Sequence, residues 1–221
     1  MGTRSIDYRA ERQAMIDRQL RRRGISNPAI LDAFASVPRE EFVGGHNAHL
    51  AYDDRALPIE GGQTISQPYI VALMIEAAAI RSGDKVLEVG AGSGYAAAII
   101  SRIATRVIGI ERNHELVEIA RHRLVSIGAD NVEIVEGDGT KGWPAEAPYD
   151  AILGSASGPH VPVSLIAQLV PGGRLVMPVG KSGLFQKLVK VTKGDDGSIQ
   201  QSDLGAVVFV PLIGAEGWDD A

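Results

Sequence analysis

Short apolar runs alternate with segments of helical periodicity from residue 82 onward, and this alternation restricts the fold more than any other feature. The first run is KVLEVG, residues 85–90, and the helical segment YAAAIISRIA, residues 95–104, follows it. A run that is apolar throughout predicts a strand buried on both faces, as in a parallel sheet covered by helices. The same criteria predict strands at 106–111, 132–138, 149–155 and 174–180, and helices at 115–128 and 161–170.

The C-terminal part of the chain departs from this alternation. Residues 185–193 and 206–213 have the pattern of strands, and the turn-rich sequence GDDGS separates them. No helix intervenes, so the sheet is expected to finish in an antiparallel pair. The chain is therefore predicted to form a doubly wound α/β sheet with an antiparallel C-terminal strand pair.

The N-terminal part adds helices to this sheet. Residues 11–23 have helical spacing and Gly24 is a natural stop. Asn27 is a good N-cap for a second helix, with Pro28 at its first position. Residues 44–62 lack a regular period and are expected to be irregular. This region is predicted to be a helical addition to the sheet.

Composition limits the classes of function that need consideration. The chain has 221 residues, of which 45% are hydrophobic, so one domain with a sizeable core is expected. A net charge of -5 gives no electrostatic reason to expect nucleic acid as a partner. The absence of cysteine excludes disulfides, thiolate metal sites and a cysteine nucleophile. The longest apolar stretch, residues 70–80, is too short to span a bilayer, and no signal-peptide pattern precedes it. A cytoplasmic protein is expected.

A glycine-rich turn, EVGAGSGY, joins the first strand to the first helix of the sheet. Glycines in such a turn let the backbone approach a ligand closely, although a tight connection alone also explains them. Tyr95 stands where the dinucleotide fingerprint needs a third glycine, so the spacing differs from that motif. The glycines of the turn are Gly90, Gly92 and Gly94.

Two carboxylates end the second and third predicted strands. Glu111 suits a ribose diol, because a carboxylate accepts hydrogen bonds from two hydroxyls. Asp138 adds an acceptor at the same edge of the sheet. Taken singly, each carboxylate is explained equally well as a turn or cap residue.

Together, Glu88, the glycine turn, Glu111 and Asp138 resemble the first three motifs of class I S-adenosylmethionine-dependent methyltransferases. The resemblance implies a Rossmann-like methyltransferase sheet, S-adenosylmethionine as cofactor and S-adenosylhomocysteine as product. It places Glu88 near the amino acid part of the cofactor and Glu111 on the ribose hydroxyls. The resemblance also implies that Asp138 faces the adenine amino group.

The segment GGQTISQPY, residues 61–69, carries two hydroxyls on either side of Ile65. Ser66, just before the apolar run with Pro68 in its first turn, is a good helix N-cap when considered alone. A helix start whose amides and hydroxyls face a carboxylate is also an anion site, so Thr64 and Ser66 are candidates for binding.

A closer resemblance extends from about residue 15 to residue 214. The stretches AILDAFASVPREEFV, AYDDRALPIEGGQTISQPYIVALM, VLEVGAGSGYAAAI, GDGTKGWPAEAPYDAIL, VPGGRLVMPVG and VVFVPLIG resemble the protein-L-isoaspartate O-methyltransferase family. GQTISQP is the most specific of these. That family methylates the α-carboxylate of L-isoaspartyl residues in damaged proteins and peptides. The ester then closes to a succinimide, which partly reopens as normal aspartate, so the resemblance implies a role in protein repair.

This resemblance also implies roles for individual residues. Ser66 is the expected active-site hydroxyl, with Thr64 nearby. One domain, 1–221, is expected, with a substrate-side segment at 1–81 and the cofactor-binding sheet and C-terminal strands at 82–221. Isoaspartyl proteins and peptides are the expected partners, without nucleic acid or membrane, and a monomer is the default. The cofactor-binding residues are expected to be Ile65, Glu88, Gly90, Gly92, Ser93, Gly94, Glu111, Asp138 and Gly139.

Two features depart from the family pattern. Glu60 stands where glycine is usual, and its carboxylate would either repel an anionic substrate or point to solvent. The loop GSASGPHVP, residues 154–162, is looser than the family pattern. Two alternatives therefore stay open, namely a carboxyl methyltransferase for a dedicated peptide or small acid, and a non-catalytic cofactor-binding protein. His46 and His49 form an H-x-x-H pair without a third ligand, so no metal site is predicted.

Overall fold

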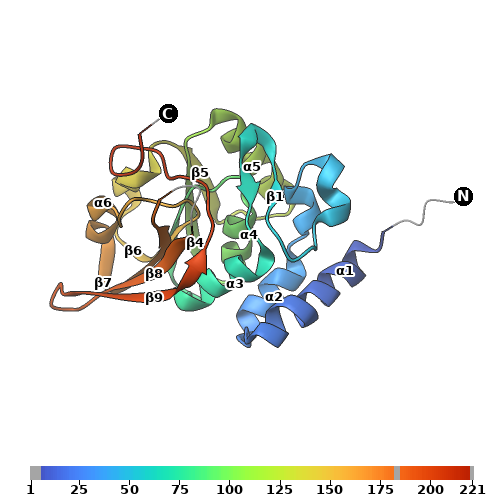
Figure 1. The fold of residues 1–221 in the computed structure, drawn as a ribbon, viewed down its shortest axis with the longest axis horizontal. Coiled ribbons are helices and arrows are strands. Elements are labelled where there is room, and N and C mark those ends of the chain that lie inside the picture. The colour runs from blue at the N-terminus through green and yellow to red at the C-terminus, as the bar shows by residue number, and fades with distance from the viewer. Residues whose placement is uncertain (1–5, 182–184, 220–221) are drawn as a thin grey trace, which may run out of the picture.

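A mostly parallel sheet forms the centre of the computed structural model, which describes residues 6–181 and 185–219 (Figure 1). In this part of the chain the sheet has seven strands in the order β5-β4-β3-β6-β7-β8-β9. The five strands β5, β4, β3, β6 and β7 pair parallel, whereas β8 and β9 are added antiparallel. This arrangement confirms the predicted fold. The strands are β3 (Lys85–Val89), β4 (Arg106–Glu111), β5 (Val132–Glu136), β6 (Tyr149–Gly154), β7 (Leu169–Val179), β8 (Gln186–Lys193) and β9 (Ile199–Val207).

The central strands are buried on both faces, as their apolar sequences predict. Val86 and Leu87 of β3 are both fully buried, yet they belong to two separate hydrophobic clusters. One cluster joins the sheet to α2 (Pro28–Ser36), α3 (Pro68–Ala77), α4 (Tyr95–Ser101) and α5 (His114–Ser126). The other lies under α6 (Val163–Ala167) on the opposite face. Successive side chains of a strand point to opposite faces, so a continuous apolar run can fill both clusters.

The strand order reverses beside β3. The chain runs from β3 outward to β4 and β5, and then returns to place β6 on the other side of β3. In an open parallel sheet, the connections leaving two such strands diverge and leave a crevice at their carboxyl ends. Val89 and Gly154 are paired at this end, so the crevice opens directly after them.

The N-terminal helices pack against α3 (Pro68–Ala77) at the end of the molecule opposite the tip of β8 and β9 (Figure 1). The single helix predicted at 11–23 consists of α1 (Tyr8–Met15), a π-helical turn and a 3-10 turn, and ends at Gly24 with a φ of 98°. The Asn27 side chain accepts a hydrogen bond from the Ala29 amide, so the predicted N-cap of α2 (Pro28–Ser36) is confirmed.

The segment predicted as irregular, 44–62, and the residues on either side of it form short elements. They are the 3-10 turns η3 (Arg39–Phe42), η4 (Gly45–Leu50) and η5 (Glu60–Gly62), and the two-residue strands β1 (Leu57–Pro58) and β2 (Thr64–Ile65). The two strands pair antiparallel, with Leu57 opposite Ile65. This small hairpin carries the TIS sequence to the crevice, immediately before α3 begins.

Two predicted elements were wrong in extent. The helix expected at 161–170 ends at Ala167, because Leu169 already pairs with Tyr149 as the start of β7. The last strand is Ile199–Val207 instead of 206–213. Strand β9 lies at the sheet edge and is mostly exposed, so it has no apolar period to detect. The apolar sequence that follows covers the crevice instead, where Pro211 bridges to Ser157.

Candidate active site

The crevice beside β3 contains a cavity of about 490 Å³, called the main cavity here. Its floor is the glycine turn, where Gly90, Gly92 and Gly94 have φ values of 81°, 53° and 85°. Residues other than glycine rarely adopt this left-handed backbone conformation, so the turn depends on glycine. The residues around the cavity include Gly62, Gln63, Thr64, Glu111, Gly139, Ser155 and Leu212.

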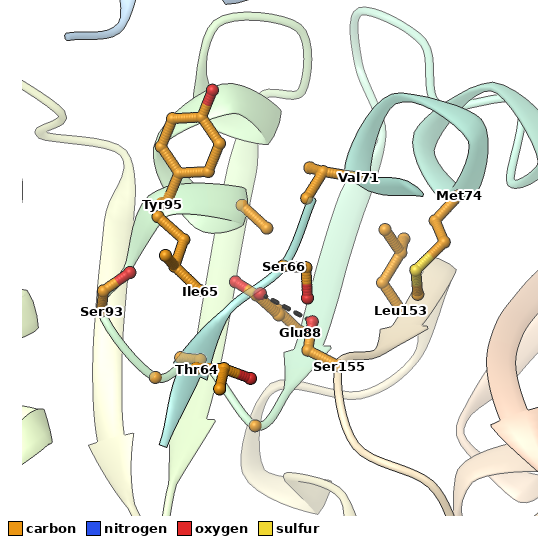
Figure 2. Close-up of a pocket in the computed structure, with 14 residues that line it drawn as sticks. Thr64, Ile65, Ser66, Val71, Met74, Glu88, Ser93, Tyr95, Leu153 and Ser155 are labelled. Carbon is orange, nitrogen blue, oxygen red and sulfur yellow. Dashed lines mark hydrogen bonds between the residues drawn. The ribbon is translucent and has the colours of Figure 1, made fainter. Parts of the chain in front are cut away.

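Glu88 lies in a smaller, deeper cavity that shares Thr64, Gly90, Gly92 and Ser155 with the main cavity (Figure 2). Its side chain is 1% exposed, and Oε1 accepts a hydrogen bond of 3.0 Å from Ser155 Oγ. Its other oxygen, Oε2, is buried without a partner in the described structure. Burial raises the pKa of Glu88 to about 8, despite the hydrogen bond from Ser155. Such a carboxylate favours a positively charged ligand group, which would supply the missing partner.

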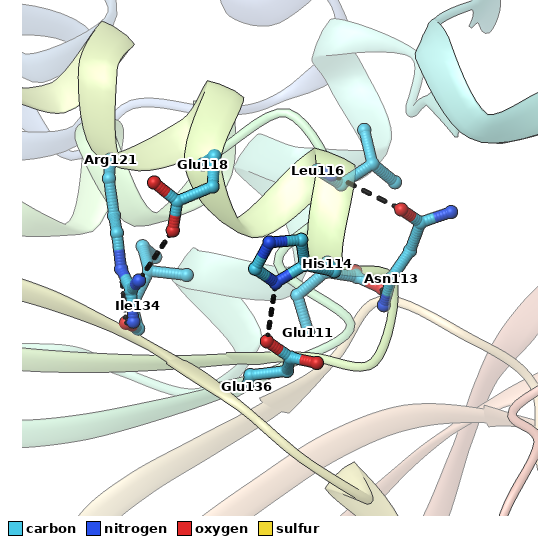
Figure 3. A network of polar contacts seen from close by, with 8 residues as sticks. All are labelled: Glu111, Asn113, His114, Leu116, Glu118, Arg121, Ile134 and Glu136. Atoms are coloured by element: carbon cyan, nitrogen blue, oxygen red, sulfur yellow. Dashed lines mark hydrogen bonds and ion pairs between the residues drawn. The ribbon is translucent and has the colours of Figure 1, made fainter.

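Glu111 closes one side of the main cavity and is held by two backbone amides. Its carboxylate oxygens accept 2.9 Å hydrogen bonds from the amides of Gly92 and Asn113. Each oxygen keeps a further lone pair, so a ribose diol can still be bound. Nearby, His114 contacts Glu136 at 2.7 Å on the exposed surface, and this hydrogen bond raises the pKa of the imidazole (Figure 3).

Asp138 lies in a cleft that adjoins the main cavity, whereas Gly139 lines the cavity itself. The Asp138 carboxylate accepts hydrogen bonds from the amide and hydroxyl of Thr140 and from the Ala215 amide. Burial opposes the charge, but these hydrogen bonds lower the pKa of Asp138 overall. The carboxylate therefore anchors the C-terminal segment, and its expected contact with an adenine amino group stays a prediction.

Ser66 is not the helix cap that the local sequence predicts. Gln67 is the N-cap residue of α3, and its side-chain amide donates to Asp54 instead of closing the helix. Because Pro68 takes the first helical position, Ser66 stands one residue too early to cap. No residue in the described ranges forms a hydrogen bond with the Ser66 hydroxyl. The hydroxyl is thus available to a ligand.

Thr64 and Ser66 separate the two inner cavities from a groove on the outer surface. Thr64 lines the main cavity, the deep cavity and an outer groove of about 320 Å³. Ser66 lines the deep cavity and the same groove. Ile65, between them, is 4% exposed and faces the deep cavity. The outer groove also contains Gln67, Ile70, Phe185, Val207 and Val208.

The loop at 154–162 is tightly constrained. A Cβ at Gly154 would lie 2.6 Å from the Met177 Cβ, so only glycine fits there. Ser157 is fully buried, and its backbone exchanges hydrogen bonds with Val210 and Leu212. The Ser157 carbonyl also accepts from the Trp218 indole at 2.9 Å. The backbone of this loop therefore fastens the C-terminal segment over the crevice.

Glu60 takes neither of the two expected orientations. Its carboxylate forms an ion pair of 2.9 Å with Arg123 of α5. The pair connects the β1–β2 hairpin to the helix that follows Glu111. The unusual glutamate thus holds the hairpin over the main cavity instead of facing a substrate.

No metal site was expected, and the part of the chain that the structure describes contains no cluster of three metal-ligating side chains. His46 and His49 are both exposed. Among the described residues, no helix combines the length and apolar character that crossing a bilayer requires.

Sequence comparison gives the family. The model described as Protein-L-isoaspartate(D-aspartate) O-methyltransferase (PCMT) matches residues 10–217. Protein-L-isoaspartate O-methyltransferase 2 of Pelobacter propionicus is 55% identical over 215 residues, which cover 97% of this chain and 95% of that protein. Protein-L-isoaspartate O-methyltransferase 1 of Rhodopseudomonas palustris is 51% identical, over 97% of this chain and 87% of its own length.

Solved structures agree with the sequence relatives. A protein-L-isoaspartate O-methyltransferase superposes with a TM-score of 0.85 at 31% identity, over 93% of this chain and 67% of that chain. A Plasmodium falciparum structure in complex with S-adenosyl-L-homocysteine has a TM-score of 0.79 at 24% identity, over 95% of this chain and 99% of that one. The second similarity supports the fold alone.

The sheet, its glycine turn and the acid that ends β4 define a class I methyltransferase whose cofactor is S-adenosylmethionine. The chain belongs to the protein-L-isoaspartate(D-aspartate) O-methyltransferase family. The unpartnered Oε2 of Glu88 fits this cofactor, because the amino acid part carries an ammonium group. The turn itself, residues 90–94, contains no lysine or arginine that could bind a phosphate, and a sulfonium ligand requires none.

The raised pKa of Glu88 predicts a pH-dependent cofactor affinity. Below about pH 8 the free protein holds a proton on Glu88, and a bound ammonium favours the ionised form. Affinity for S-adenosylhomocysteine should therefore increase from about pH 6 to pH 8, by at most about tenfold per unit, with release of a proton. Titration calorimetry in buffers of different ionisation enthalpy measures both the affinity and the number of protons released.

The matched variants are Glu88→Gln and, on the exposed face of α5, Glu115→Gln. Glu88→Gln should weaken binding at pH 8 and remove the pH dependence, whereas Glu115→Gln should behave as the wild type. A wild-type affinity that does not change over this range would contradict the assignment.

Proposed function

We propose that this chain transfers the methyl group of S-adenosylmethionine to the α-carboxylate of L-isoaspartyl residues in damaged proteins and peptides. The product ester would then close to a succinimide and start repair. One observation carries the proposal: the family-specific TIS segment separates the main cavity from the outer groove, so its two hydroxyls can meet both cofactor and acceptor.

The acceptor carboxylate enters through the outer groove and accepts a hydrogen bond from Ser66, with Thr64 beside it. The free Ser66 hydroxyl and its position on both the groove and the deep cavity support this role. A groove that is open to solvent suits a peptide chain on either side of the reacting residue. Phe185 and Val208, which are 82% and 66% exposed, offer apolar contacts to neighbouring residues of that peptide.

The chemistry requires alignment more than proton transfer. An acceptor carboxylate has a pKa of about 4 and is already ionised near neutrality, so no general base is needed. The bound cofactor supplies an electrophilic methyl group, and its sulfur keeps the electron pair of the bond that breaks. Ser66 and Thr64 orient the carboxylate oxygen for in-line attack. The hairpin and the C-terminal segment exclude water while the opposite charges neutralise.

We infer that the chain acts as one domain, as a monomer and in the cytoplasm. Residues 1–81 would provide the substrate side, and residues 82–221 the cofactor-binding sheet. The absence of cysteine suits a reducing compartment, and the net charge of -5 argues against a nucleic acid partner. Gel filtration with light scattering tests the monomer directly.

Paired peptides test the acceptor. The purified protein with labelled S-adenosylmethionine should methylate an L-isoaspartyl peptide and leave the same peptide with normal aspartate unlabelled. The ester formed should be labile to mild base and decay to succinimide, as mass spectrometry can follow. Equal labelling of both peptides, or labelling of neither, would contradict the proposal.

Ser66→Ala should lower kcat/KM for the isoaspartyl peptide by about 10- to 100-fold, the value of a lost hydrogen bond to a charged group. Affinity for S-adenosylhomocysteine should change less than about twofold, since Ser66 contacts the acceptor. Ser126→Ala is the control, because its hydroxyl donates only to the Arg123 carbonyl on the exposed face of α5. Parallel losses of turnover, cofactor affinity and melting temperature in Ser66→Ala would indicate a structural role instead.

A further inference from the structure

Arg39 is fully buried immediately behind the Thr64–Ser66 segment. It begins η3, has an exposed fraction of 0%, and does not line any of the cavities described above. A fully buried arginine is uncommon unless its charge is paired. The sequence analysis did not single it out, since one arginine within VPREEFV has no period or spacing that marks it.

The guanidinium group of Arg39 is bound by neutral groups. Nε donates to the Ala51 carbonyl at 2.7 Å, and Nη2 donates to the Ser66 carbonyl at 2.8 Å. The central guanidinium carbon, Cζ, lies 4.7 Å from the centroid of the Tyr95 ring. In the described structure, Nη1 has no partner and no carboxylate forms an ion pair with the group. The adjacent Glu40 is engaged by Arg12 and Tyr52 instead.

This charge is retained although it is costly to bury. Burial lowers the pKa of Arg39, yet an arginine stays protonated at any ordinary pH. A buried ion without a counter-ion reduces stability, whereas an apolar side chain of similar volume would not. The position of the cation therefore indicates a role besides packing.

The contacts of Arg39 join two parts of the site. The Ser66 carbonyl belongs to the residue whose hydroxyl faces the acceptor. Tyr95 follows the glycine turn directly, lines the deep cavity and has a pKa raised to about 12 by burial (Figure 2). Arg39 thus holds the acceptor segment against the start of the helix that follows the cofactor turn.

Two buried ionisable groups without a counter-ion consequently flank the deep cavity, an acid and a base. Glu88, on the β3 side, lacks a cation, and Arg39, behind Ser66 and Tyr95, lacks an anion. A positively charged ligand is favoured near Glu88, and a negatively charged ligand is favoured near Ser66. This arrangement matches a cationic methyl donor and an anionic acceptor that must meet in one orientation.

We propose that Arg39 is a positioning residue for methyl transfer, which fixes Ser66 through its carbonyl and supplies the buried positive charge that selects an anionic acceptor. The proposal rests on the proposed function of Ser66. It assigns Arg39 no direct contact with the acceptor. Its effect is on acceptor affinity and orientation, with the cofactor site left largely intact.

The test compares the wild type with Arg39→Met, which removes the charge, and Arg39→Lys, which keeps it. Two competing peptides are measured against each: one with the isoaspartyl α-carboxylate and one with a carboxamide in its place. The inhibition constant of the carboxamide peptide divided by that of the carboxylate peptide reports the preference for an anion. Arg39→Met should reduce this ratio about tenfold and raise KM, while the dissociation constant of S-adenosylhomocysteine changes less than about twofold. Arg39→Lys should recover part of the ratio.

Arg12→Met is the matched control. Arg12 is another largely buried arginine of the N-terminal region, but Glu40 and Tyr52 bind it. Its removal should lower the melting temperature without changing the peptide ratio. If Arg39→Met does not fold, Arg39→Gln replaces it, since its amide can still donate to the Ser66 carbonyl.

An unchanged peptide ratio in a folded Arg39 variant would overturn the proposal, as would equal losses of peptide and cofactor affinity. These outcomes differ from failure of the proposed function. If the function is wrong, the wild type itself will not distinguish isoaspartyl from aspartyl peptides. If only the role of Arg39 is wrong, the wild type will distinguish them and the variants will keep its preference for the carboxylate.

Discussion

The central strand β3 is buried on both faces, so the polar groups of the site gather at its carboxyl end, where the order of the sheet reverses. The other parts of the site depend on this constraint. The chain leaves β3 through a turn of left-handed glycines, and β6 departs on the other side, which opens the main cavity. Glu88 reaches the cavity from within β3, and Glu111 reaches it from the neighbouring strand β4. The carboxylates are thus fixed by strands instead of by mobile loops.

The segments outside the sheet complete the site from two directions. The β1–β2 hairpin brings Thr64 and Ser66 to the cavity, and the Glu60–Arg123 ion pair connects that hairpin to α5. From the other direction, Ser157 binds the C-terminal segment over the crevice. Both contacts use residues that depart from the usual family sequence, and both serve the shape of the site. The sequence departures therefore give no reason to favour a different acceptor.

The sequence predicts what depends on local periodicity and leaves undetermined what depends on tertiary contacts. The parallel strands, the N-cap at Asn27 and the position of the glycine turn follow from local patterns. Strand β9 was misplaced because an exposed edge strand needs no apolar face. The cap at Ser66 was wrong because Gln67 and Pro68 begin the helix one residue later. The buried charge of Arg39 emerges only when residues 27 positions apart come together.

The central claim is that Thr64 and Ser66 separate a cofactor site from an acceptor groove, with the buried Glu88 on the cofactor side and the buried Arg39 behind Ser66. A crystal structure with S-adenosylhomocysteine and an isoaspartyl peptide tests it most directly. The cofactor ammonium should lie within hydrogen-bond distance of Glu88 Oε2, and the peptide α-carboxylate should accept from the Ser66 hydroxyl. A carboxylate bound away from Ser66, or a cofactor whose ammonium points away from Glu88, would contradict the account.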